Sequence, residues 1–187
     1  MVPIPSLWLG ILLGAVIVFI VSSIIHMVLP YHRNDFSGVA NEDAVMDALR
    51  PFNIPPGEYV VPRAGSPAAM KTPEFKAKVE KGPVLFLNVM PAGMPSMGSS
   101  LVQWFLYCAL VGVFAAYVAG RTLMPGAEYW AVSRVASTVA FAGYGLALLQ
   151  NSIWYKRAWS TTAKSLFDAL IYAMLTGGAL AGFWPAM

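Results

Sequence analysis

The chain has 187 residues, of which 58% are hydrophobic and only 11% are charged, and its mean hydropathy is +0.62. This composition lies outside the usual range of soluble globular proteins and predicts an integral membrane protein. The formal net charge is only +3 and no run of Lys or Arg resembles a nucleic-acid surface, so we expect no nucleic-acid partner. The single cysteine, Cys108, excludes an intramolecular disulfide.

Four apolar stretches are each long enough to cross the hydrocarbon core of a bilayer as a helix, at roughly 1.5 Å per residue. They span residues 7–29, 101–119, 130–149 and 166–184. We therefore predict an all-α integral membrane protein with four transmembrane helices. Residues 1–29 form the first helix, residues 30–99 an extramembrane loop module, and residues 100–187 a three-helix transmembrane region.

The first stretch differs from a signal peptide, because no Lys or Arg precedes it and its apolar run exceeds the usual length of about 7–15 residues. We expect a retained helix that ends at Pro30. The next residues, Tyr31, His32 and Arg33, form an aromatic and basic group suited to the lipid headgroup layer.

The loop module is rich in Pro and Gly and is predicted to be a small α+β unit. Asn41 is expected to cap one short helix, and Thr72 followed by Pro73 is expected to begin another. Two β-prone runs, residues 59–61 and 84–89, flank the second helix and are expected to pair.

Basic residues near the ends of the spans predict the orientation, because Lys and Arg concentrate on the cytoplasmic side. Arg33, Lys156, Arg157 and Lys164 flank the side of the long loop, whereas Arg121 and the terminal amine flank the other side. We expect the long loop in the cytoplasm and both termini outside.

Small residues recur at helical spacing within the spans and predict close helix packing. The strongest positions are Gly10, Gly14, Gly112, Ala116, Ala169, Ala173, Gly177 and Ala181. The favoured interpretation is packing within the bundle, and the alternative is a docking face for another membrane subunit.

Polar residues within the spans are the first place to look for function. Because consecutive helices are antiparallel, five of them are expected to share one polar layer on the long-loop side: His26, Gln103, Gln150, Asn151 and Asp168. Asp168 is expected in the first turn of its helix, where the helix dipole and Lys164 would hold its carboxylate as an interfacial anchor. The alternative is a proton or ion relay between Asp168 and His26.

Two further groups of residues each allow two interpretations, a structural role and a specific binding site. Trp154, Tyr155, Lys156 and Arg157 are typical of an interfacial anchor, with a lipid-headgroup site as the alternative. Three soft thioethers, Met90, Met94 and Met97, are weak candidates for a Cu(I) site, although methionine also fills gaps in cores.

Sequence motifs of hydrolases, kinases and zinc enzymes are absent, and only two histidines are available as bases or ligands. We therefore expect neither catalysis nor a cofactor. The expected function is a non-catalytic accessory, scaffold or assembly subunit that lies in the lipid bilayer and binds another membrane subunit or itself. The alternative is a transporter-like protein that handles protons or Cu(I) as an oligomer.

Overall fold

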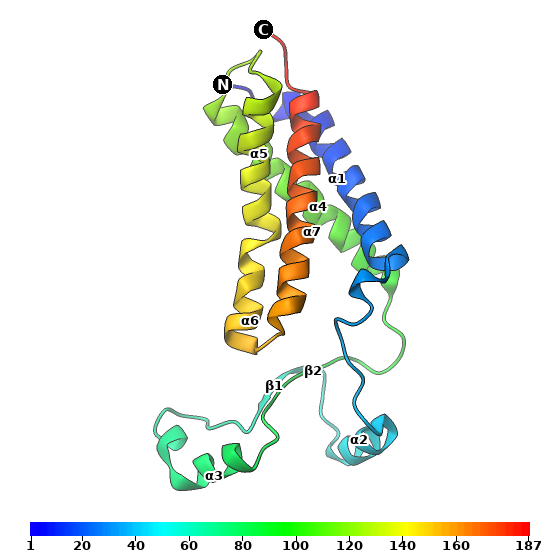
Figure 1. The fold of residues 1–187 in the computed structure, drawn as a ribbon, viewed down its shortest axis with the longest axis vertical. Coiled ribbons are helices and arrows are strands. Elements are labelled where there is room, and N and C mark those ends of the chain that lie inside the picture. The colour runs from blue at the N-terminus through cyan, green and yellow to red at the C-terminus, as the bar shows by residue number, and fades with distance from the viewer. The chain divides into compact units, whose positions relative to one another are not determined.

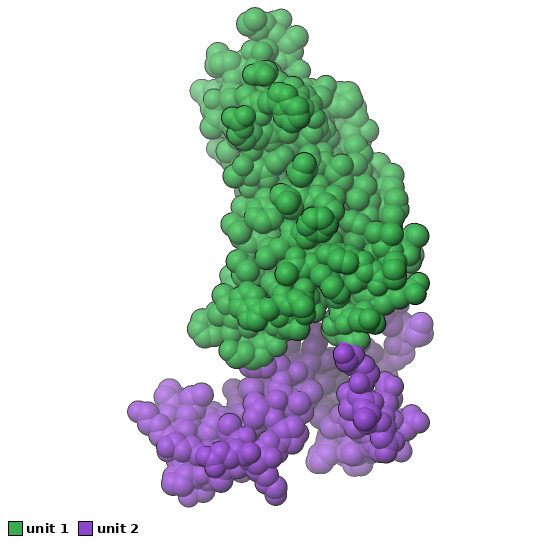
Figure 2. All heavy atoms as spheres, in the orientation of Figure 1, with its two compact units in different colours: residues 1–36, 96–187 green, residues 37–95 purple.

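The computed structural model describes residues 1–187 and is mostly helical, with four long apolar helices and a small two-stranded sheet between α1 and α4 (Figure 1). The chain divides into two compact units. The first, which we call the bundle, comprises Met1–Phe36 and Ser96–Met187, and the second, the module, is Ser37–Pro95 (Figure 2). The predicted all-α membrane fold with a small α+β loop unit is confirmed.

The four predicted transmembrane helices are present, each long and apolar enough to cross a membrane, as expected of a multi-pass membrane protein. They span Ile4–Val28, Met97–Thr122, Tyr129–Tyr155 and Trp159–Gly182. The first consists of η1 (Ile4–Leu7), α1 (Trp8–Ser23) and a π-helical turn, η2 (Ile24–Val28). The second is α4 (Met97–Thr122) and the last is α7 (Trp159–Gly182).

The third span contains a break that the sequence pattern did not predict. It consists of α5 (Tyr129–Tyr144), a 3-10 turn, η6 (Leu146–Leu148), and α6 (Leu149–Tyr155). The break follows Gly145, where an added Cβ would lie 3.1 Å from the Cβ of Ala169 on α7. Close packing on α7 therefore accompanies the local change of helix type.

Small residues let the helices approach closely, and all eight predicted packing positions are buried. Gly10 and Gly14 face Leu180 and Thr176, so this strip of α1 lies on α7. Gly112 brings α4 against Ile11 of α1. These positions therefore serve packing within one chain.

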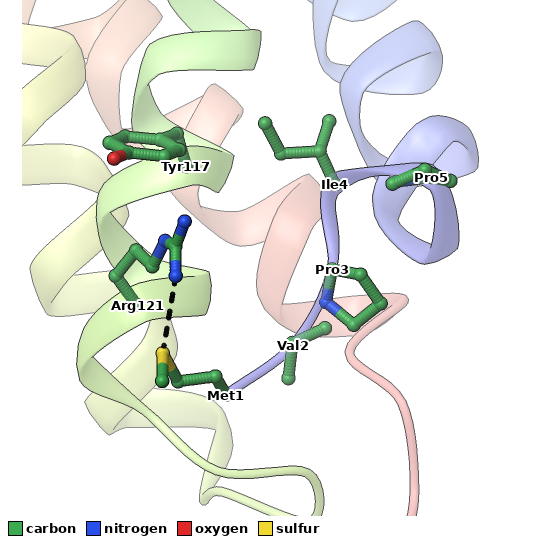
Figure 3. A pocket seen from close by; sticks show the side chains of 7 residues that line it. All are labelled: Met1, Val2, Pro3, Ile4, Pro5, Tyr117 and Arg121. Atoms are coloured by element: carbon green, nitrogen blue, oxygen red, sulfur yellow. Dashed lines mark hydrogen bonds between the residues drawn. The ribbon is translucent and has the colours of Figure 1, made fainter.

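The N-terminal segment contacts the C-terminal end of α4, which is the end away from the long loop. The Val2 amide donates a 2.8 Å hydrogen bond to the Gly120 carbonyl, and the Val2 side chain is buried. A hollow of about 380 Å³ lies beside this contact, between residues 1–5 and the side chains of Tyr117 and Arg121 (Figure 3).

The module contains α2 (Glu42–Leu49), β1 (Gly57–Val61), α3 (Pro73–Lys81) and β2 (Leu85–Val89). The two strands pair antiparallel, with Gly57 opposite Val89 and Val61 opposite Leu85, as predicted. The expected Thr72 cap is present, because its hydroxyl accepts a hydrogen bond from the Phe75 amide. The expected Asn41 cap is absent: Asn41 has a φ of +54° and its side chain makes no cap bond.

Candidate functional site

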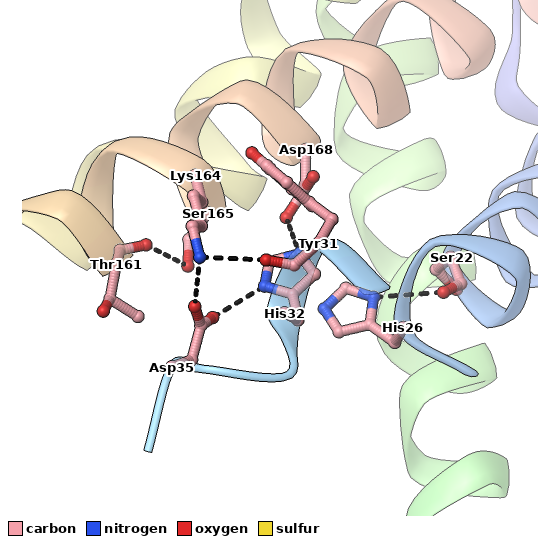
Figure 4. A network of polar contacts seen from close by, with 9 residues as sticks. All are labelled: Ser22, His26, Tyr31, His32, Asp35, Thr161, Lys164, Ser165 and Asp168. Atoms are coloured by element: carbon pink, nitrogen blue, oxygen red, sulfur yellow. Dashed lines mark hydrogen bonds and ion pairs between the residues drawn. The ribbon is translucent and has the colours of Figure 1, made fainter. Parts of the chain in front are cut away.

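Five ionisable side chains gather where α1 ends, near the start of α7 (Figure 4). We call this group the polar cluster: His26, His32, Asp35, Lys164 and Asp168. His26 belongs to η2, and Lys164 and Asp168 belong to α7. His32 and Asp35 come from the segment Pro30–Phe36, which begins with the 3-10 turn η3 (Pro30–His32) and which we call the strap.

The two histidines lie face to face. Their ring centroids are 4.4 Å apart and the ring planes differ by 7°. Nδ1 of His26 lies 3.0 Å from the Ser22 carbonyl oxygen, which can only accept a hydrogen bond. Nδ1 therefore carries a proton, and in the neutral ring the lone pair is on Nε2.

His32 lies between two carboxylates. Its Nδ1 donates a 2.6 Å hydrogen bond to Oδ2 of Asp35, and its Nε2 lies 2.9 Å from Oδ2 of Asp168. The second contact has the distance of an ion pair but not the alignment of a hydrogen bond, so Nε2 of His32 has no hydrogen-bond partner.

Lys164 holds the strap against α7. Its ammonium donates a 2.8 Å hydrogen bond to Oδ1 of Asp35 and a 2.9 Å hydrogen bond to the Tyr31 carbonyl oxygen. The hydrogen bond from Lys164 lowers the pKa of the Asp35 carboxyl most, and the hydrogen bond from His32 lowers it further. The pKa therefore lies below its usual value. Burial has the largest effect on the Tyr31 hydroxyl and raises its pKa, and the charge of Asp168 raises this pKa further.

Asp168 is the most buried member of the polar cluster, with 3% of its surface exposed. Its Oδ1 is buried without a hydrogen-bond partner. The predicted surroundings of Asp168 are wrong in two respects. It lies nine residues after Trp159, about 2.5 turns into α7 and not in the first turn, and Lys164 is paired with Asp35 instead.

A cavity of about 350 Å³ adjoins the polar cluster inside the bundle. His26 and Asp168 contribute to its wall, together with four aromatic side chains: Trp104, Tyr107, Tyr144 and Tyr172. Trp104 also donates a 2.8 Å hydrogen bond to the hydroxyl of Ser22, which ties α4 to α1 beside His26. Aromatic rings thus form much of the cavity wall, which also includes the ionisable side chains of His26 and Asp168.

The other members of the predicted polar layer do not join the cluster. Gln103 is exposed and donates to Ser99 on its own helix. Gln150 is exposed on α6, and neither it nor Asn151 forms a side-chain hydrogen bond with His26 or Asp168. Of the five expected residues, the structure brings together His26 and Asp168.

The remaining candidates lie on the surface. Trp154, Tyr155 and Lys156 are exposed at the end of α6, and Arg157 is half-buried, so the interfacial anchor stays a prediction. The predicted methionines follow β2 and begin α4, and all three are exposed: Met90, Met94 and Met97. The structure shows no contact that joins them, so the Cu(I) site stays a prediction.

Sequence reasoning missed His32 and Asp35 as members of the site, because it assigned Tyr31, His32 and Arg33 to the headgroup layer and gave Asp35 no role. The available signal was the spacing of His26, His32 and Asp35 around Pro30, a residue that ends a helix and lets the chain turn back. A comparison with known proteins adds no further residue: no family model, no curated protein and no solved structure matches the chain.

Proposed function

We propose that the protein is a non-catalytic accessory or assembly subunit of a membrane complex, and that the module binds a second membrane protein. The observation that supports this proposal most directly is the absence of any buried side chain in residues 37–95. A folded unit is stabilised mainly by apolar surface removed from water, and the module removes little by itself.

The module nevertheless presents apolar side chains that a partner can cover. On α2 these are Val45, Met46 and Leu49, and Phe52 follows with 72% of its surface exposed. The sheet has only two strands, so each strand keeps one unpaired edge. An isolated pair of strands is marginally stable in water, and a further strand from a partner would complete it.

The charge of the module favours a protein partner over an anionic surface. Residues 37–95 include six acidic and six basic residues, so their formal net charge is zero. Binding to nucleic acid or to acidic lipid headgroups relies on an excess of Lys and Arg.

The test is extraction of the full chain from its native membrane in mild detergent, followed by measurement of the mass of the complex. We expect a defined complex with a membrane protein of different sequence. Phe52→Asp should weaken the complex at least about tenfold, because large aromatic side chains dominate interface energies. Asn53→Asp adds the same charge one residue later without removing apolar surface, so this control should leave the complex intact.

A mass equal to that of a single chain would overturn the proposal. A closed ring of identical chains would instead favour the alternative, a transporter-like protein that handles ions as an oligomer. The polar cluster beside the aromatic cavity is the feature that favours this second candidate.

A further inference from the structure

We propose that His26, His32 and Asp168 form a binding site for one divalent first-row transition-metal ion. Each residue offers one ligand atom, and these atoms all lie within 4.8 Å of one another. Imidazole nitrogen and carboxylate oxygen are the donors that Zn²⁺, Fe²⁺ and Co²⁺ accept in proteins. The site is independent of the docking proposed for the module, because all three residues belong to the bundle.

The hydrogen bonds around the histidines present the correct nitrogen to a metal. A metal-binding histidine usually donates its other ring N–H to a carbonyl or carboxylate, which fixes the tautomer and orients the ring. His26 donates from Nδ1 to the Ser22 carbonyl, and His32 donates from Nδ1 to Asp35. Figure 4 shows the second ring nitrogen of His26 on the side of His32. In their neutral forms both rings therefore carry their lone pairs on Nε2.

The same tautomer explains the poor alignment between His32 and Asp168. If Nε2 of His32 carried a proton, Oδ2 of Asp168 at 2.9 Å would be its natural acceptor. The geometry lacks that hydrogen bond, and Oδ1 of Asp168 has no partner either. A buried carboxylate needs a compensating positive charge, and the nearby Lys164 is paired with Asp35. A bound cation supplies that charge.

The donors fit a small ion after the His26 ring turns out of its stack on His32, because ring lone pairs lie in the ring planes and these planes are nearly parallel. Bonds of about 2.0–2.1 Å in a tetrahedral site place the donor atoms roughly 3.4 Å apart. His26 lies on the π-helical turn η2 and is exposed, so its ring can rotate to direct Nε2 between His32 and Asp168 without unpacking the bundle. π-helical turns of this kind are frequent at functional sites.

Three protein ligands leave a coordination position open. Structural zinc sites usually have four protein ligands, whereas three ligands leave room for water or another small molecule. His26 and Asp168 both line the aromatic cavity of about 350 Å³. Two of the three ligands thus adjoin a half-open pocket of the bundle that can hold a small ligand of the metal.

Asp35 and Lys164 are positioning residues in this site. Asp35 accepts from His32 on one oxygen and from Lys164 on the other, so the lysine fixes the carboxylate that orients the imidazole. Loss of such an outer partner typically weakens metal binding 10–100-fold. This effect distinguishes the proposed site from a set of independent ion pairs.

The experiment is a titration of the full-length, detergent-purified protein with Co²⁺ after treatment with EDTA and removal of the chelator. We expect one Co²⁺ per chain, with visible absorption bands that disappear when Zn²⁺ displaces it. His26→Ala and Asp168→Asn should each weaken binding on the order of 100-fold or more, and Asp35→Asn should weaken it 10–100-fold. Asp47→Asn is the matched control, since it neutralises an exposed carboxylate in the module and should not change binding.

X-ray absorption at the zinc edge of the wild-type protein provides a measurement that needs no variant, and it should show two imidazole ligands. The proposal is overturned if the wild type binds no stoichiometric metal or if the spectrum shows no imidazole. Unchanged Co²⁺ binding in folded His26→Ala overturns it as well. None of these results affects the mass measurement that tests the docking of the module.

Discussion

Gly177 lies where α7 packs tightly against α5. A Cβ atom added there would be 2.0 Å from the hydroxyl oxygen of Ser137 and 2.8 Å from the carbonyl oxygen of Ser133, both on α5. Backbone atoms cannot move aside as a flexible side chain can, so even alanine would separate α5 from α7. Glycine is therefore required at this position by space and not by backbone conformation.

We predict that Gly177→Ala destabilises the bundle by about 1–3 kcal/mol, the usual cost of overpacking a core. The cost outweighs the gain of up to about 1 kcal/mol that alanine brings to a helix. Thermal unfolding in detergent measures the change. Gly182→Ala is the matched control, because a Cβ there meets nothing within 4 Å, and it should leave the melting temperature unchanged or higher. Equal melting of the two variants would contradict the close approach.

At the residue scale, part of the site could be predicted from the depth at which each polar residue was expected to lie in the membrane. His26 and Asp168 were expected to lie level because antiparallel helices place the end of one beside the start of another, and the structure brings them together. His32 and Asp35 were missed because their position depends on the strap turning back toward α7. Pro30 indicates where the helix ends, but the direction of the turn depends on the distant contact with Lys164, which no local pattern encodes.

Helix ends show how the local sequence defines an element. Thr72 has an extended backbone and its hydroxyl accepts from the Phe75 amide at 3.3 Å, so it satisfies a free N–H at the start of α3. Asn41 precedes α2 in the left-handed region, where its side chain makes no such bond. Both were predicted as caps from residue type, and the backbone conformation decides which one acts.

We predict that Thr72→Ala destabilises α3 by about 1 kcal/mol, the typical cost of losing a cap. Because no side chain of α3 is buried, the loss should stay local. Hydrogen exchange should therefore accelerate in residues 73–81 and stay the same in the bundle. Asn41→Gly serves as the comparison, since glycine adopts a positive φ readily, and it should leave exchange in α2 unchanged or slower. Slower exchange in α3 after Thr72→Ala would disprove the cap.

Apolar composition predicts where each span lies, but it does not predict the residues at which the helix begins and ends. The third and fourth spans were expected at residues 130–149 and 166–184, but the helices run Tyr129–Tyr155 and Trp159–Gly182. Backbone hydrogen bonding continues the helix into the polar interface, because a broken end near lipid leaves N–H and C=O groups unpaired. This extension places Asp168 well inside α7 and explains why its predicted first-turn position was wrong.

At the scale of the whole molecule, an even number of spans places both chain ends on one side of the membrane. The loop between α1 and α4 and the connection between α6 and α7 then share the opposite side. Arg33, Lys156, Arg157 and Lys164 lie beside span ends on that side, whereas Arg121 lies beside a span end on the side of the termini.

We predict that the module is cytoplasmic, because Lys and Arg near span ends are retained on that side. Single cysteines at Ser66, in the module, and at Glu128, before α5, can be probed with a thiol reagent that does not cross the membrane. The native Cys108 has only 1% of its surface exposed and should give little background. In intact cells Glu128→Cys should react and Ser66→Cys should react only after the membrane is opened. The reverse pattern would invert the orientation, and labelling of both sites from outside would contradict α4, the helix that separates them, as a membrane span.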